Sequence, residues 1–470
     1  MSTAAIERRA IREAVSVAPA LAITASAAFL LVRTLPDISG KPWHEDEAVA
    51  GLISAQPLGD VLHTVVLDRG GAPLHFLLTH VAFAVDGSPR TLRWLSLLFA
   101  VATIPLCYDL ARRLAGRFAG LLAAALAATS QLLAVYATFG RMYSLFAFVS
   151  ALALDLFVRA VDRPTRGTVV AAVAAGLLPI AVHPFGVFLA GAELAVAVWL
   201  WQFRAVAAGL LGLPLVIPYL RLPGRYDPAV GMTAPEAALR ALGGSAGGYG
   251  IGLALFAVLA GIGAWTLPRS FAAVGVLAIA APATTLGVLG SEELSPRHLI
   301  FVLPIWTAFV AAGAARVPVR IVVASALVAL AALAPAAVTD PRTTPSAVAA
   351  PAAWLRAQLE QGDVLYPYSP LFLAALPEAA KARALPREPL ALARALRRTD
   401  EARRVFVAIP LREPLRRRVP GAHVFRSWVI LEERGPFALV PQLLAHIAPS
   451  LKDTSAYASV LQLRGAACGC

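Results

Sequence analysis

The sequence predicts an all-α polytopic membrane protein with about eleven transmembrane helices, followed by a small C-terminal α/β domain. Three observations support this prediction. Hydrophobic residues make up 59% of the 470 residues and charged residues only 15%, whereas a soluble domain has about 45–50% apolar and about 25% charged residues. Apolar runs long enough to cross a bilayer recur up to Val338, and the composition becomes polar and amphipathic after it.

A transmembrane helix needs about 20 mainly apolar residues. The runs that approach this length are Val15–Leu35, Thr91–Leu110, Phe118–Phe139, Met142–Val161, Thr168–Val182, Phe185–Trp201, Ala205–Leu220, Ile251–Leu267, Phe271–Leu289, Leu299–Ala315 and Val317–Val338. The first run is expected to remain as a helix, because it is too long for a cleaved signal peptide. The shorter segment Gly71–Val85 contains His75 and His80 and is expected to form an interfacial or re-entrant helix.

Arginine residues concentrate in every second loop. With the N-terminus in the cytoplasm, clusters such as Arg112–Arg113 and Arg159–Arg163 fall on the inner side, in agreement with the positive-inside rule. The intervening loops, Asp37–Asp68 and Arg221–Gly250, are then extracytoplasmic. We therefore expect a multi-pass protein of the inner (plasma) membrane that carries its C-terminal domain outside.

Two regions follow from this pattern: a transmembrane domain over residues 1–338, with a first outer loop at 36–90, and a soluble α/β domain over residues 339–470. The elements expected in the second domain are a helix at Ala350–Gln361, strands at Val405–Ile409 and Val429–Glu433, and a final helix near Pro441–His446. The basic run Arg416–Arg418 is expected to be solvated or to face lipid head groups, not nucleic acid.

The first outer loop contains three consecutive acidic residues, Glu45, Asp46 and Glu47, shortly after Trp43. One interpretation is a solvated acidic loop. The second is a general base or a divalent-metal ligand placed beside a lipid-borne substrate.

Further short motifs follow the acidic residues along the chain. In order they are Trp43-x-x-Asp46-Glu47-Ala48, Ala72-Pro73-Leu74-His75-Phe76, Arg93-x-x-Ser96, Arg141-Met142-Tyr143-Ser144, His183 and Pro296-Arg297-His298-Leu299. Together they resemble the motifs of the GT-C membrane glycosyltransferases, particularly the dolichyl-phosphate-mannose protein mannosyltransferase type and its bacterial relatives. The resemblance covers roughly Ala20–Val338 and continues into the outer domain.

The resemblance implies an external active site, a sugar donor carried on a polyprenyl phosphate, and a hydroxyl acceptor that is a glycan, a lipid or a protein. Asp46 would be the general base and Glu47 its partner. The chain departs from the family pattern at Gly71, Ala72 and Phe139. Phe139 stands where an acidic or amide residue is often found, so a second carboxylate ligand for a metal ion is missing there. A divalent cation would have to be bound by Glu45, Asp46 and Glu47 or by the outer acids Glu292 and Glu293, and metal dependence stays open.

Six further residues are candidates for contact with the substrate. They are Arg297, Arg141, His183, Arg69, Tyr143 and His75. An arginine suits the donor phosphate because its guanidinium pairs bidentately with phosphate oxygens. A purely structural role stays open for five of them. Arg297 could snorkel to lipid head groups, and Arg141 could form an ion pair within the bundle. His183 could bond only a backbone carbonyl, Tyr143 could simply pack, and His75 could be only an interfacial residue.

Two other classes of protein compete with this interpretation. A polysaccharide polymerase or ligase would also need an outer catalytic loop and basic residues. A transporter would usually place polar residues near the bilayer midplane and show inverted repeats, whereas the polar residues here concentrate in outer loops and no internal repeat is visible.

Overall fold

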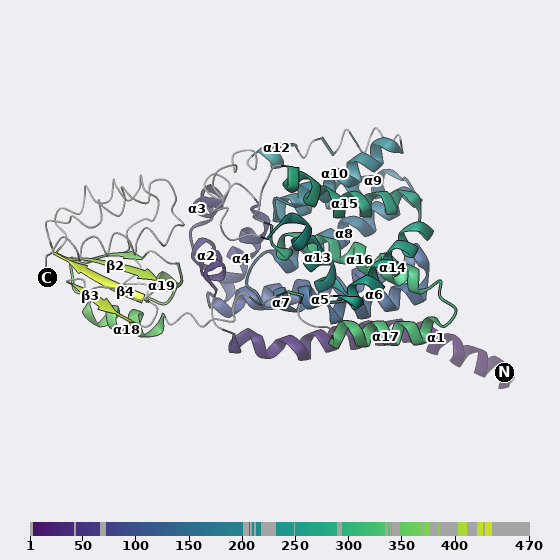
Figure 1. The fold of residues 1–470 in the computed structure, drawn as a ribbon, viewed down its shortest axis with the longest axis horizontal. Coiled ribbons are helices and arrows are strands. Elements are labelled where there is room, and N and C mark those ends of the chain that lie inside the picture. The colour runs from purple at the N-terminus through teal and green to yellow at the C-terminus, as the bar shows by residue number, and fades with distance from the viewer. Residues whose placement is uncertain are drawn as a thin grey trace. The chain divides into compact units, whose positions relative to one another are not determined.

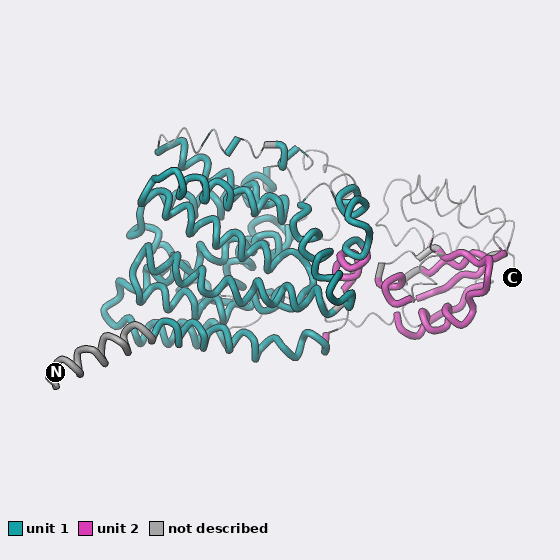
Figure 2. The backbone as a smooth tube through the Cα atoms, turned by 180° about the vertical axis from the view of Figure 1, so that it is seen from behind, with its two compact units in different colours: residues 1–40, 53–340 teal, residues 41–52, 341–470 magenta. Residues whose placement is uncertain are grey.

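The structure is a computed structural model of the chain. It describes residues 3–41, 44–65, 72–200, 206, 209–210, 213–217, 232–248, 250–288, 294–333, 337–338, 340, 348–367, 370–376, 384, 403–410, 421–425 and 428–434. The chain forms two compact units, coloured separately in Figure 2. Unit 1 comprises residues 1–40 and 53–340, and unit 2 comprises residues 41–52 and 341–470.

Unit 1 is a bundle of helices (Figure 1). Its described helices are α1 (Thr3–Gly40), α3 (Leu58–His63), α4 (Leu74–Val85), α5 (Pro89–Ala115), α6 (Arg117–Thr129), α7 (Gln131–Ala137), α8 (Tyr143–Asp162), α9 (Arg166–Val182), α10 (Gly186–Trp199), α12 (Leu213–Val216), α13 (Ala234–Ser245), α14 (Ile251–Thr266), α15 (Arg269–Val288), the 3₁₀ helix η4 (Pro296–Val302), α16 (Leu303–Ala314) and α17 (Arg320–Leu333). Helix α2 (Glu45–Ser54) begins in the segment that belongs to unit 2.

Among the described helices, five are long and apolar enough to cross a membrane, and a sixth span results if the bent pair α6 and α7 counts as one. The predicted run Phe118–Phe139 is thus broken by a bend of 54°. Ser130 lies at the break, where its hydroxyl accepts the Leu133 N–H at 3.1 Å and caps α7. The count of eleven spans stays a prediction, because further apolar helices are shorter than 18 residues.

Close helix packing in unit 1 uses small residues. A Cβ on Gly263 of α14 would overlap the carbonyl oxygen of Phe309 in α16, and one on Gly313 of α16 would overlap that of Leu259 in α14. Helices associate closely in a membrane where small side chains let their backbones meet. The two glycines therefore fix the contact between α14 and α16, and α16 also packs against α5 and α6.

The charged side chains of α5 and α8 form an ionic network at the ends of these helices. Asp155, whose side chain is 1% exposed, pairs with Arg113 at 3.0 Å and with Arg159 at 2.6 Å. Arg159 also reaches Asp109 at 2.9 Å. These arginines belong to the loops expected on the cytoplasmic side, and the network shows how a nearly buried carboxylate there is neutralised.

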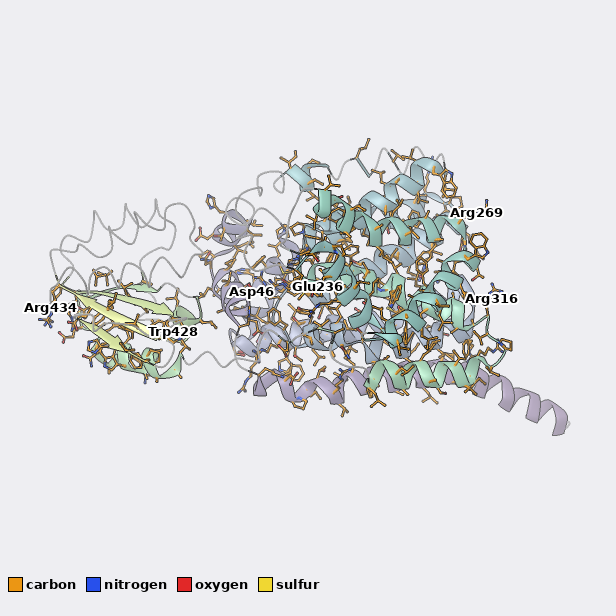
Figure 3. The ribbon with its side chains drawn as sticks, in the orientation of Figure 1. Asp46, Glu236, Arg269, Arg316, Trp428 and Arg434 are labelled. Carbon is orange, nitrogen blue, oxygen red and sulfur yellow. The ribbon has the colours of Figure 1, made fainter. Side chains whose placement is uncertain are left out.

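Arg269 and Arg316 fall in further loops that the alternation of arginines assigns to the cytoplasmic side. Arg269 and Arg316 lie at the same end of unit 1, the end from which α1 begins (Figure 3). The structure thus gathers at one end residues that the alternation of charge assigned to one side of the membrane.

Unit 2 contains a four-stranded sheet of order β1-β2-β4-β3, formed by β1 (Val364–Pro367), β2 (Val405–Pro410), β4 (Trp428–Glu433) and β3 (Ala422–Val424). The β1 and β2 strands are parallel, and the other two pairings are antiparallel. Two helices accompany the sheet, α18 (Ala349–Gln358) and α19 (Pro370–Ala374).

The core of this domain lies between the sheet and its helices. Leu355 of α18, Phe372 of α19, Phe406 of β2 and Ile430 of β4 are fully buried. The small α/β domain predicted from the sequence is therefore present, with strands close to the predicted Val405–Ile409 and Val429–Glu433 and a helix close to Ala350–Gln361. The predicted final helix at 441–446 lies outside the described residues.

Candidate functional site

A group of basic and aromatic side chains lies where η4, the start of α8 and the turn between α9 and α10 meet. The guanidinium carbon of Arg297 lies 5.6 Å from the ring centre of Tyr143. The Tyr143 ring is 6.0 Å from the His183 ring, which is 5.4 Å from the His298 ring. We call these four residues, together with Arg141, the basic–aromatic cluster.

Arg141 enters the cluster from the turn that precedes α8. Its guanidinium carbon lies 5.9 Å from the ring centre of Phe76 in α4, and Phe76 makes an edge-on contact with His75. His75 is 2% exposed, and its Nε2 has no hydrogen-bond partner among the described residues. The helix α4 therefore brings His75 and Phe76 to the Arg141 side of the cluster.

The backbone at Arg141 is fixed by a serine from α5. Ser96 is buried, and its hydroxyl donates to the carbonyl of Phe139 at 2.8 Å and to that of Arg141 at 3.3 Å. The Ser144 hydroxyl donates to the Tyr136 carbonyl at 2.7 Å on the other side of the turn. Since polar groups buried here must be paired, these bonds hold the turn in one conformation.

Arg93, the first residue of the Arg93-x-x-Ser96 motif, connects the start of α5 to the end of α1. Arg93 is 2% exposed, and its Nη1 donates to the carbonyls of Asp37 and Ile38 at 3.2 and 3.0 Å. These are carbonyls of the last turn of α1, which have no partner within the helix. The Arg93-x-x-Ser96 motif thus connects the end of α1, the start of α5 and the turn that carries Arg141.

The hydrogen bonds of the two histidines define their protonation. The backbone N–H of Phe185 donates to His183 Nδ1 at 3.1 Å, and that of Ser295 donates to His298 Nδ1 at 3.4 Å. A ring nitrogen that accepts a hydrogen bond carries no proton. Each neutral imidazole therefore carries its proton on Nε2, where it is a hydrogen-bond donor.

The charge of the cluster comes from its arginines. Burial, with the nearby charges of Arg141 and Arg297, lowers the pKa of His183 in the turn between α9 and α10 to about 3. His183 is consequently neutral at physiological pH. Two guanidinium groups and two neutral N–H donors make a set suited to a phosphate, which offers only acceptor oxygens to its partners.

The acidic residues of the first outer loop are arranged as the start of a helix. Glu47 is fully buried, and its Oε2 accepts the backbone N–H of His44 at 3.1 Å. This is the return bond of a capping box, made by a carboxylate three residues after the N-cap position. Asp46 donates its backbone N–H to His44 Nδ1 at 3.1 Å, and its side chain stays 30% exposed. Glu47 therefore positions the loop, while the Asp46 carboxylate remains accessible.

Several predicted residues do not take part in this geometry. Trp43, Arg69, Glu292 and Glu293 lie outside the described residues. His80 contacts the backbone carbonyl of Ser54 at 2.9 Å through Nδ1, which is a structural role. In the part of the chain that the structure describes, no group of three or more histidine, cysteine or acidic side chains is arranged to hold a metal ion.

His298 is the member of the cluster that sequence reasoning missed. It directly follows Arg297 in the motif Pro296-Arg297-His298-Leu299, and this position beside a selected arginine was the available signal. Its ring lies 5.4 Å from His183 and 5.3 Å from Phe185.

Comparison with solved structures identifies the fold. The structure is similar to that of ArnT from Cupriavidus metallidurans in the apo state, with a TM-score of 0.60 and 14% sequence identity. The match covers 89% of this chain and 98% of the ArnT chain. The same protein bound to undecaprenyl phosphate matches with a TM-score of 0.57 and 15% identity, over 88% and 97% of the two chains. No family model and no curated protein matches the sequence. The chain has the GT-C fold. This confirms the fold expected from the motifs.

Proposed function

We propose that this protein is a membrane glycosyltransferase that moves a sugar from a polyprenyl-phosphate donor to an extracytoplasmic hydroxyl acceptor. The observation that carries the proposal is the meeting of Arg141, Arg297, His183 and His298 in one cluster. Its support from the comparisons is a fold shared with a protein crystallised with undecaprenyl phosphate.

In this proposal the cluster binds the phosphate that leaves with the lipid. The two arginines neutralise the charge that develops on the phosphate oxygen as the bond to the sugar breaks. Such electrostatic stabilisation of the transition state is usually the largest contribution to an enzyme's rate enhancement. The imidazole Nε2–H groups donate hydrogen bonds without adding charge. Tyr143 and Phe146 pack against His183 and keep it in place.

We assign the role of general base to Asp46, on the basis of the motif in which it stands and its accessible carboxylate. The carboxylate takes the proton of the acceptor hydroxyl while the hydroxyl oxygen forms a bond to the anomeric carbon. The bond from that carbon to the phosphate oxygen breaks, and the polyprenyl phosphate leaves with the electron pair. Attack opposite the leaving group inverts the anomeric centre. Any divalent cation would act beside Asp46 and Glu47.

The proposal is tested with purified protein and a panel of labelled polyprenyl-phosphate sugars. Release of free polyprenyl phosphate that depends on an added acceptor, a glycan, a lipid or a peptide hydroxyl, is the expected result. Products of increasing length would instead identify a polymerase. Movement of the intact donor across a vesicle membrane without release of phosphate would support a transporter and contradict the proposal.

A further inference from the structure

A cavity of about 350 Å³ lies within unit 1 between α8, α9 and α10. Its walls are apolar, with residues such as Phe157 of α8, Val173 and Leu177 of α9, and Leu194 of α10. Mostly apolar concave sites with few polar groups are typical of small-molecule binding. None of the lining residues belongs to the basic–aromatic cluster.

One ionisable side chain enters this apolar space. Glu193 of α10 is 7% exposed, and its Oε1 has no hydrogen-bond partner within the described ranges of the chain. Of the described residues that line the cavity, Glu193 is the one with an acidic side chain, and none is basic. An isolated buried carboxylate is costly unless it is paired, and an ionisable residue within a membrane helix is by default a hypothesis for a functional site.

The helix opposite Glu193 leaves room for it. Gly176 of α9 faces the carboxylate so closely that a Cβ on this residue would lie 2.9 Å from Glu193 Oε2. The absence of a side chain at Gly176 therefore keeps the space around the carboxylate open. A ligand of this cavity must fill its apolar space. It must also supply the positive charge that no described lining residue provides for the Glu193 carboxylate.

We propose that this cavity binds a small hydrophobic cation, an ammonium group with hydrocarbon substituents, whose charge pairs with Glu193. A neutral hydrocarbon would fill the cavity but leave the Glu193 carboxylate without a partner. An anion would be repelled by this carboxylate. The proposal is independent of the glycosyltransferase function, because it concerns residues outside the basic–aromatic cluster.

The test compares two ligands of the same shape on the full-length protein in detergent: phenyltrimethylammonium and its neutral isostere tert-butylbenzene. Calorimetric titration should show saturable binding of the cation, and affinity at least tenfold weaker for the neutral compound. The cation should bind at least tenfold more weakly to Glu193→Gln. Glu236→Gln is the matched control, since Glu236 lies on α13, pairs with Arg240 and does not line the cavity.

Gly176→Ala keeps the carboxylate and narrows the space beside it, so it should also weaken binding of the cation. Gly176→Ala replaces Glu193→Gln in the test if a thermal melt shows that Glu193→Gln is unstable. Equal affinity of the wild-type protein for the two ligands, or unchanged affinity in the Glu193 and Gly176 variants, would overturn the proposal. Absence of saturable binding of the cation would do the same.

Discussion

At the scale of single residues, the two acids of the first outer loop have separate tasks although they are adjacent in sequence. Glu47 is buried and caps the start of α2, whereas the Asp46 side chain remains 30% exposed. A general base must reach the substrate, and a capping residue need not. The structure therefore predicts that replacing the carboxylate by an amide affects activity differently at Asp46 and at Glu47.

We predict that Asp46→Asn abolishes turnover while the protein still inserts and binds donor. The amide keeps the size of the side chain but cannot take a proton, and loss of a general base costs roughly 10²–10⁴-fold in rate. Glu47→Gln should cost less, because glutamine also completes a capping box. Release of polyprenyl phosphate measures both variants. An inactive Glu47→Gln beside an active Asp46→Asn would mean that Glu47 is the base.

The histidines show how a residue's role can depend on its backbone neighbours. Sequence reasoning selected His183 but could not say which ring nitrogen carries the proton. That depends on the N–H of Phe185, which meets Nδ1 only because the turn between α9 and α10 places it there. His298 was missed because nothing in the sequence places its ring beside that of His183, 115 positions earlier in the chain; the fold brings the two rings to 5.4 Å.

At the scale of secondary-structure elements, a short polar motif in α5 positions a residue of the cluster. We predict that Ser96→Ala weakens binding of a short-chain polyprenyl phosphate several-fold, because the turn of Arg141 loses the hydroxyl hydrogen that is shared between the carbonyls of Phe139 and Arg141. A typical buried hydrogen bond contributes about 0.5–1.5 kcal/mol. Binding is measured by calorimetry in detergent.

Ser150→Ala is the control for this change. Its hydroxyl is also buried, but it donates to the Phe146 carbonyl within α8 and does not connect two elements. Unchanged binding in Ser96→Ala, or an equal loss in the two variants, would show that Ser96 does not position Arg141.

Next to the sheet of unit 2, the ion pair between Asp363 and Arg404 predicts how the stability of the domain depends on pH. Asp363 is fully buried; burial alone would raise its pKa, but hydrogen bonds from Arg404 and the Glu360 N–H outweigh this and lower the pKa below its ordinary value. A lowered pKa stabilises the folded state above the unfolded pKa of about 3.9. That stabilisation is lost as the pH falls through the pKa of the folded state.

We therefore predict that Asp363→Asn destabilises the domain by about 3–5 kcal/mol at pH 7, the usual cost of removing one partner of a buried pair. The difference from wild type should shrink below about pH 4, the region of the unfolded pKa. Hydrogen exchange of peptides covering β2 and β4, compared between wild type and Asp363→Asn at the same pH, measures this difference in stability. Arg403→Ala is the control, since the Arg403–Glu360 pair is exposed and such pairs contribute little. A difference that stays the same from neutral to acidic pH would contradict the assignment.

At the scale of the whole molecule, composition and charge alternation were sufficient to predict a helical membrane protein with a small α/β domain. The number of spans could not be predicted, because several apolar runs form helices shorter than 18 residues and one run is broken at Ser130. Apolar composition does not distinguish a full span from a broken one. Likewise, spacing along the sequence could not bring Arg141, His183 and Arg297 together, since they come from three segments that are far apart along the chain.

The alternation of arginines also predicts the orientation of the chain. A reporter fused after Val338 should give an extracytoplasmic signal, and so should tags within Asp37–Asp68 and Arg221–Gly250. Tags beside Arg269 or Arg316 should be cytoplasmic. Accessibility to an impermeant thiol reagent in intact cells checks each position. A cytoplasmic signal from the first loop would place Asp46 on the side opposite to an external acceptor.

The central claim is that the basic–aromatic cluster binds the phosphate of a lipid-linked donor, and the affinity for a short-chain polyprenyl phosphate tests it most directly. Arg297→Ala should bind about tenfold to a hundredfold more weakly than wild type, because a charge-assisted hydrogen bond contributes about 1.5–3 kcal/mol. Arg297→Lys should be intermediate, since lysine cannot pair bidentately. Arg316→Ala, at the end of the bundle where α1 begins, should bind normally. Wild-type affinity in both Arg297→Ala and Arg141→Ala would contradict the account.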